Sequence, residues 1–229
     1  MPRLLLIETS TSLCSTALAE DGRIVCSRRS TEPRAHASLT AVFVKEMLEE
    51  SGWTVRELDA VAVSAGPGSY TGLRVGSSTA KGLCFGGQVP LIAVSTLDIL
   101  ARQAIEAGLP EGCKAILPMV DARRMEVYTA VYSPDGARLT DISPVILDEN
   151  SFADLFASGP VAVIGDAAEK FAPLRATAAG SVFMQCCPEA SAMLVPAMRK
   201  YEKKEFEDTA YFEPFYLKQF IATTPKKLF

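Results

Sequence analysis

Histidine is almost absent from the 229-residue chain, which contains only His36. The six cysteines, at positions 14, 26, 84, 113, 186 and 187, form no Cys-x-x-Cys pair, and a chain of this size does not need disulfides to stabilise its core. We therefore expect reduced thiols in a cytoplasmic protein and no metal site. No apolar run approaches the ~18 residues of a membrane helix, and the run at 4–7 is too short for a secretory signal.

A basic stripe of the kind that RNA-binding proteins usually carry is also missing. The net charge is −4 and the pI is about 5.2. The run at 199–208 mixes both signs, which is typical of the solvated face of a helix. Charge alone therefore does not predict that this chain binds nucleic acid by itself.

The pattern of apolar residues and turns predicts alternating strands and helices. Strands are expected at 3–8, 13–19, 23–29, 59–65, 90–95, 115–121, 126–132, 138–147 and 161–165, and helices at 36–51, about 70–86, 96–107, 151–157, 167–171 and 189–204. Each half begins with consecutive strands and continues with alternating helices and strands. This repeated order predicts two related α/β domains with mixed sheets. We place them at 1–98 and 99–229, with the last helix and tail as candidates to pack back on the first domain.

Two helices carry apolar or small residues on more than one face, although a surface helix normally has a single apolar stripe. Interior glycines in the second of these helices each cost ~1 kcal/mol relative to alanine, so a compensating close contact is expected. We favour a helix of another chain as the partner of helix 36–51, with burial inside the domain as the alternative; for the second helix both interpretations are open. The predicted partner interface comprises Leu39, Val42, Phe43, Met47, Gly72, Gly76 and Ala80.

The stretch SAGPGSYTGLR, Ser64–Arg74, lies between a predicted strand and a predicted helix, where many proteins hold a phosphate. It matches neither phosphate-loop pattern, because no Gly-Lys pair follows and Thr71 stands where G-x-G-x-x-G requires its third glycine. Anion binding stays open, as does a purely structural turn. The candidate anion or nucleotide contacts are Gly66, Gly68, Ser69, Thr71, Arg74, Asp121 and Arg123, and a structural salt bridge is the alternative for the last two.

Other chemistry finds little support. AVSAG at 62–66 lacks the first glycine of a hydrolase nucleophile elbow, and the single histidine precedes the serine, so neither a serine hydrolase nor another protease is indicated. His36 has Thr40, not a second ligand, one helical turn away. Glu8 ends the first strand, but no glycine follows before Gly22, so that hairpin is a poor phosphate clamp.

Five segments together resemble, in order along the chain, the bacterial TsaB family, also called YeaZ. They are LIETSTSLCSTAL, SAGPGSYTGLRVGSSTAKGL, VSTLD at 94–98, DARRMEVYTAVY at 121–132 and EPFYLK at 213–218. The resemblance implies the actin, Hsp70 and sugar-kinase (ASKHA, ribonuclease H-like) fold. It also implies a role in making N6-threonylcarbamoyladenosine at position 37 of tRNAs that read codons beginning with A.

The resemblance further implies a division of labour. The paralogue TsaD carries the metal on an H-x-x-x-H motif and transfers the threonylcarbamoyl group, TsaB supports TsaD as a heterodimer, and the ATPase TsaE joins them. Thr40 replaces the second histidine here, so we expect a non-catalytic subunit with no tightly bound cofactor. ATP or ADP is expected only in the complex, tRNA only through the partners, and a homodimer when the chain is alone. The alternative is an independent ATP-binding phosphotransferase of the same fold, motivated by the glycine loop and Glu8.

Overall fold

The structure is a computed structural model, and it describes residues 2–175 and 179–217. Two five-stranded sheets have the same strand order, β3-β2-β1-β4-β5 and β8-β7-β6-β9-β10. The strands are β1 Arg3–Glu8, β2 Cys14–Glu20, β3 Arg23–Ser30, β4 Ala60–Ser64, β5 Leu91–Val94, β6 Ala115–Asp121, β7 Glu126–Thr129, β8 Ser143–Ile146, β9 Val161–Gly165 and β10 Val182–Gln185. In both sheets the first strand pairs antiparallel with the second and parallel with the fourth. The prediction of two related domains with mixed sheets is confirmed.

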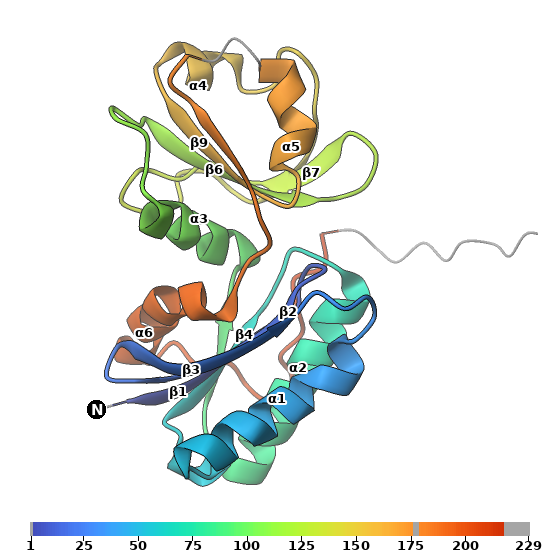
Figure 1. Ribbon diagram of the computed structural model, residues 1–229, viewed down its shortest axis with the longest axis vertical. Coiled ribbons are helices and arrows are strands. Elements are labelled where there is room, and N and C mark those ends of the chain that lie inside the picture. The colour runs from blue at the N-terminus through green and yellow to red at the C-terminus, as the bar shows by residue number, and fades with distance from the viewer. Residues whose placement is uncertain (1, 176–178, 218–229) are drawn as a thin grey trace, which may run out of the picture.

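Helices cover both faces of each sheet (Figure 1). They are α1 His36–Ser51, α2 Tyr70–Gly87, α3 Thr96–Ala107, α4 Ala153–Ala157, α5 Ala168–Phe171 and α6 Leu194–Glu202, with short 3-10 turns η1 Val55–Glu57, η2 Ala172–Arg175 and η3 Ala190–Met193. α1 and α2 lie side by side on one face of the first sheet, and η3 and α6 pack on its other face. α3 packs on the second sheet and meets α6 between the two sheets. In the described residues no helix is long and apolar enough to cross a bilayer.

The central strand β1 is buried on both sides, as expected of a strand covered by two helical layers. Leu5 and Ile7 face the core under α1 and α2, whereas Leu4 and Leu6 face the core under η3 and α6. This alternation fixes the register, because a slip by one residue would exchange the two faces. The carboxyl end of β1 is thereby held between two packed layers, and the candidate site begins there.

The segment after α6 returns to the first domain and runs along its edge strand β5. The backbone N–H of Glu207 donates to Leu91 O at 2.9 Å, and that of Phe215 donates to Ala65 O at 2.7 Å. Lys81 on α2 donates from Nζ to the carbonyl oxygen of Phe212 at 3.1 Å. The end of the chain is thus part of the first domain's wall. The boundary between residues 98 and 99 stays a prediction; it falls within α3, whose buried Leu97, with other α3 residues, belongs to the core of the second sheet.

Sequence and structure differ at a few elements. Strand β10 was not predicted, because its four residues form too short an apolar run. The helix expected at 189–204 begins as the 3-10 turn η3 and becomes α-helical only at Leu194. Of the extended chain expected at 138–147, only Ser143–Ile146 is a strand. The last residue of EPFYLK, Lys218, lies outside the described residues.

Candidate functional site

The loop before α2 is closed against the turn that follows β1. The N–H of Ser69 donates to Ser10 O at 2.6 Å, and Thr9 Oγ1 donates to Gly72 O at 2.8 Å. A side chain at Gly68 would overlap the carbonyl oxygen of Ser10, and one at Gly72 would overlap that of Thr9. These glycines are therefore needed for direct contact between two backbone segments.

This contact takes up two of the N–H donors at the start of α2 that could hold a phosphate. The Ser69 side chain caps α2 by accepting from Gly72 N at 3.3 Å, and its own N–H is bonded to Ser10. Gly66, at φ +103°, sits against Phe215, whose carbonyl oxygen a Cβ would meet. Gly66, Gly68 and Ser69 are thus brought together by contacts within the chain. Thr71 is exposed on the first turn of the helix.

Glu8, at the end of β1, is fully buried. Its Oε1 accepts from Ser10 N at 2.6 Å, while Oε2 has no hydrogen-bond partner. Burial raises the pKa of Glu8 from 4.5 to about 7, and the bonds from Ser10 only partly offset this. An enclosed carboxyl group beside the loop would repel phosphate whenever it is ionised, so it disfavours a phosphate clamp here.

Asp121, at the end of β6, forms its ion pair with a residue that the sequence did not indicate. Lys170 Nζ on α5 lies 2.7 Å from Asp121 Oδ1, and the Asp121 backbone N–H donates to Asp166 Oδ1 at 2.8 Å. Arg123 gives Asp121 only its backbone N–H, at 2.5 Å. The alternative of a structural salt bridge between Asp121 and the Arg123 side chain is therefore wrong, because Asp121 pairs with Lys170. Burial raises the pKa of Asp166 to about 6, and the nearby Asp121 charge adds to this rise.

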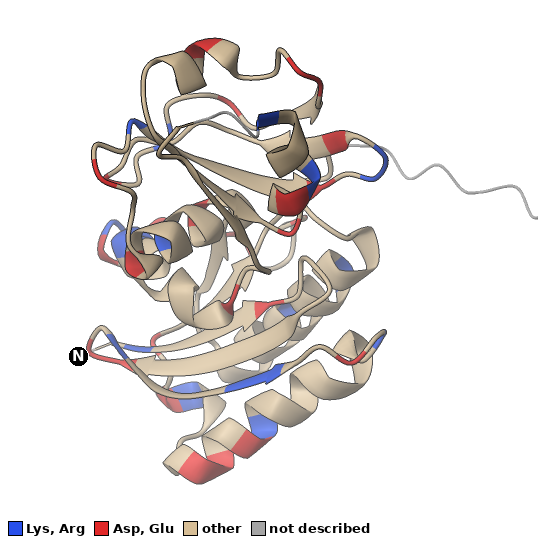
Figure 2. Ribbon diagram, turned by 45° about the horizontal axis from the view of Figure 1, so that its top comes forward, with Lys and Arg blue, Asp and Glu red and all other residues tan. Residues whose placement is uncertain are grey.

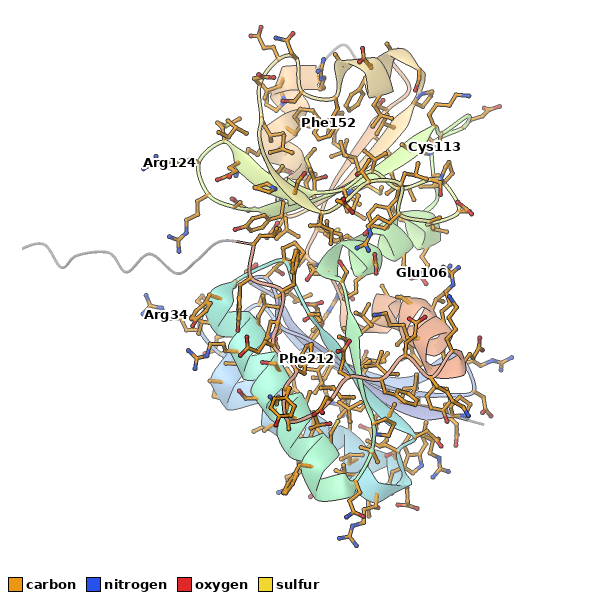
Figure 3. All side chains as sticks on the ribbon, turned by 180° about the vertical axis from the view of Figure 1, so that it is seen from behind. Arg34, Glu106, Cys113, Arg124, Phe152 and Phe212 are labelled. Atoms are coloured by element: carbon orange, nitrogen blue, oxygen red, sulfur yellow. The ribbon has the colours of Figure 1, made fainter. Side chains whose placement is uncertain are left out.

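An open groove of about 920 Å³ lies between the returning C-terminal segment and the second domain. Phe212, one of the residues that line it, is labelled in Figure 3. Six carboxylates line it against two cations: Asp98, Asp141, Glu205, Glu207, Asp208 and Glu213, and Arg138 and Lys200. It opens at the carboxyl ends of β4 and β5, where α/β proteins commonly bind ligands. The excess of negative charge disfavours the phosphates of a nucleotide.

The predicted partner interface needs correction at four residues. Met47 is fully buried in the domain's own core. Gly72 and Gly76 are buried against Thr9, and Ala80 is fully buried on the inner side of α2. These four residues cannot contact another chain, so for them the alternative of packing inside the domain holds.

The remaining predicted residues lie on the outer side of α1. Val42 is 44% exposed, and Leu39 and Phe43 are half-buried. The neighbouring outer side of α2 carries Val75, Ser78, Thr79, Gly82, Phe85 and Gly86, which the sequence prediction missed. Phe85 is 85% exposed, and a Cβ at Gly82 or Gly86 would meet nothing within 4 Å. We call these nine residues the docking face.

The metal of the TsaD paralogue does not fit this chain. Thr40 stands one turn after His36, and its hydroxyl donates to the His36 carbonyl oxygen at 2.6 Å. The described residues contain no group of three His, Cys, Asp or Glu side chains that could hold a metal ion. His36 therefore lacks the ligands that a zinc or iron site needs.

Two sheets of the same strand order, each between helical layers, define the actin, Hsp70 and sugar-kinase class of fold. A family model described as "TsaD: tRNA N6-adenosine threonylcarbamoyltransferase" matches residues 30–175. YeaZ from Pseudomonas aeruginosa superposes with a TM-score of 0.76 at 27% identity, covering 95% of this chain and 100% of that one. This structure identifies the YeaZ (TsaB) branch of the class, and the family model shows that the chain is also similar to TsaD.

Two relatives in sequence agree with that assignment. The tRNA threonylcarbamoyladenosine biosynthesis protein TsaB of Escherichia coli is 39% identical over 133 residues, which are 58% of this chain and 56% of that protein. An uncharacterized protein of Mycobacterium tuberculosis is 32% identical over 202 residues, 84% of this chain and 89% of that protein. For the first curated relatives it matches, all named TsaB, the chain spans only about half of their length. It belongs to the TsaB family.

Proposed function

We propose that this chain is a non-catalytic subunit of the threonylcarbamoyl transferase complex, which makes N6-threonylcarbamoyladenosine at position 37 of tRNAs reading A-starting codons. Its task is to bind and support TsaD. The observation that carries the proposal is the docking face of α1 and α2, which is apolar, glycine-bearing and uncovered. The E. coli relative is named for threonylcarbamoyladenosine biosynthesis, which supports the reaction.

The docking face suits the helices of another protein. Gly82 and Gly86 weaken α2 by about 1 kcal/mol each relative to alanine, and no contact within the described residues compensates. Small residues let a second helix approach closely, and the exposed Phe85 offers an anchor at one end. The TsaD family model spans both α1 and α2, so TsaD can present a similar helix pair. Two such pairs would bury each other's apolar faces.

The same face explains the expected homodimer. An isologous dimer uses one surface patch twice, and two copies of this chain can pair α1 and α2 when TsaD is absent. TsaD then displaces one copy. TsaE and any ATP belong to the assembled complex, and the setting is the cytoplasm, where tRNA is modified.

A non-catalytic role is supported by the closed loop. The Ser10 carbonyl oxygen accepts the Ser69 N–H at the start of α2, and Lys170 neutralises Asp121. The independent phosphotransferase would need a phosphate site in one of these places. A calorimetric titration of ATP into the isolated chain is expected to give no binding heat; saturable heat with turnover would establish the phosphotransferase instead.

Reconstitution of tRNA modification tests the proposal. Purified TsaD, TsaE, threonylcarbamoyl adenylate and unmodified tRNA are combined with and without this chain. Leu39→Asp and Phe43→Asp place a charge on the docking face and should abolish both modification and co-purification with TsaD. Leu139→Asp, at a 61% exposed position of the second domain, is the control and should behave as wild type. Equal modification without the chain would refute the proposal.

A further inference from the structure

Three side chains form a stacked ladder at the start of α2. The Arg74 guanidinium lies 5.4 Å from the centre of the Tyr70 ring, and its Nη1 donates to the Tyr70 hydroxyl at 3.1 Å. On the returning C-terminal segment, Tyr216 lies with its ring centre 5.0 Å from that of Tyr70, tilted by 46°. Both tyrosines are 37% exposed, and Arg74 is exposed. The ladder therefore presents aromatic surface and a cation together.

Further arginines flank the ladder. Arg34, before α1, and Arg124, in the turn after β6, are exposed and point outward from the same edge of the molecule (Figure 3). The place where the described chain ends after Tyr216 lies between them, and Figure 2 shows basic residues on this edge. Arg123 in the same turn is also exposed.

The positive charges of these arginines are not neutralised by ion pairs among the described residues. Among the described residues none of Arg34, Arg74, Arg123 and Arg124 forms an ion pair, whereas Asp121 beside them is already paired with Lys170. The acidic neighbours in sequence are Glu32, Asp121, Glu126 and Glu213, and Asp121 is the one paired with Lys170. What this edge offers is four arginines that form no ion pair among the described residues.

Arginine with exposed tyrosine rings is the combination that recognises single-stranded RNA. Unpaired bases stack on aromatic rings and guanidinium planes, while arginines neutralise the phosphates. Tyrosine and arginine are also common in protein interfaces. The four arginines without an ion pair near the rings favour a polyanion, and unpaired bases can stack on the exposed part of each ring, so we favour RNA.

We propose that this arginine–tyrosine surface, formed by Arg34, Tyr70, Arg74, Arg123, Arg124 and Tyr216, binds the single-stranded anticodon loop region of the tRNA held by the complex. The inference rests on the proposed function, since it gives this subunit a direct share in holding that substrate. The surface adjoins the N-terminal ends of α1 and α2, so RNA seated on a partner at the docking face can reach it. It also replaces the expectation that tRNA contacts come through the partners alone.

RNA binding by the complex with TsaD tests the surface. The probes are a labelled anticodon stem–loop RNA and a blunt double-stranded RNA of equal length, followed by fluorescence anisotropy between about 50 and 200 mM salt. Tyr216→Ala is expected to weaken stem–loop binding roughly 5- to 100-fold, as loss of one stacked base does, and to leave the duplex unchanged. Arg124→Ala, in an exposed turn where folding is not at risk, should lower the slope of log K against log salt by about 0.7.

Arg56→Ala is the matched control, because Arg56 is exposed and unpaired within the described chain but lies in η1, away from the ladder. Wild-type affinity and salt slope in both surface variants would overturn the inference. So would loss of TsaD binding by Arg124→Ala, which would make the surface a protein contact. Modification that still requires the chain would leave the proposed function standing in either case, whereas modification that proceeds without it would refute that function separately.

Discussion

Replacing Glu8 by glutamine makes the buried carboxyl group at the end of β1 permanently neutral at nearly constant shape. In the folded chain the pKa of Glu8 is raised from 4.5 to about 7 by burial. The difference is about 2.5 units, and each unit corresponds to about 1.4 kcal/mol, so the linked free energy is about 3.5 kcal/mol.

The sign follows from proton binding. As the pH rises through 4.5, the unfolded chain loses the Glu8 proton first, while the folded chain keeps it up to about pH 7. The free energy of unfolding therefore falls across this window and levels off above it. The glutamine variant lacks this loss, so its stability relative to wild type should rise by up to about 3.5 kcal/mol between pH 4.5 and pH 8.

Urea unfolding curves of both proteins at several pH values measure this difference. Asp166→Asn is the control: burial also raises the pKa of Asp166, to about 6, so its effect has the same sign but a lower window that starts near 3.8. A constant difference between Glu8→Gln and wild type from pH 4.5 to pH 8 would refute the assignment of a buried, largely protonated Glu8.

Three further predictions concern two glycines of α2 and the effect of Lys170 on the pKa of Asp166. Gly72→Ala should destabilise the chain by about 1–3 kcal/mol, because its Cβ would overlap the Thr9 carbonyl oxygen; unchanged thermal unfolding would contradict this contact. Gly82→Ala should stabilise the isolated chain by up to about 1 kcal/mol, since its side has open space, and a loss of stability would mean that the position is covered. Lys170→Met should raise the pKa of Asp166 above about 6, measured by carboxyl NMR titration, and an unchanged pKa would show that Lys170 does not act on it.

The sequence predicted the parts of the fold that depend on local patterns. The bounds of α1 and α3 agree with the prediction residue for residue. Their periodicity and their caps at Gly52 and Ser95 depend only on residues that are close together in the sequence. The strand order repeats because each half contains the same succession of elements. Such features need no knowledge of distant contacts.

The parts that failed depend on which side of an element is covered. Small residues every four positions on α2 predict close packing, but only the fold shows that Gly76 meets Thr9 while Gly82 faces outward. Lys170 pairs with Asp121 from a different helix, and no spacing rule indicates that pair. The ladder of Tyr70 and Tyr216 joins the loop to the end of the chain, which the sequence pattern could not place together.

The most direct test of the docking face is the affinity of TsaD for Gly82→Leu, measured by calorimetry. The substitution fills open space on α2 and leaves the chain folded, so it should obstruct a partner helix and weaken TsaD binding at least about tenfold. Glu111→Leu adds the same side chain at an exposed position of the second domain and should bind TsaD as the wild type does. Equal affinity of wild type and Gly82→Leu for TsaD would contradict the account.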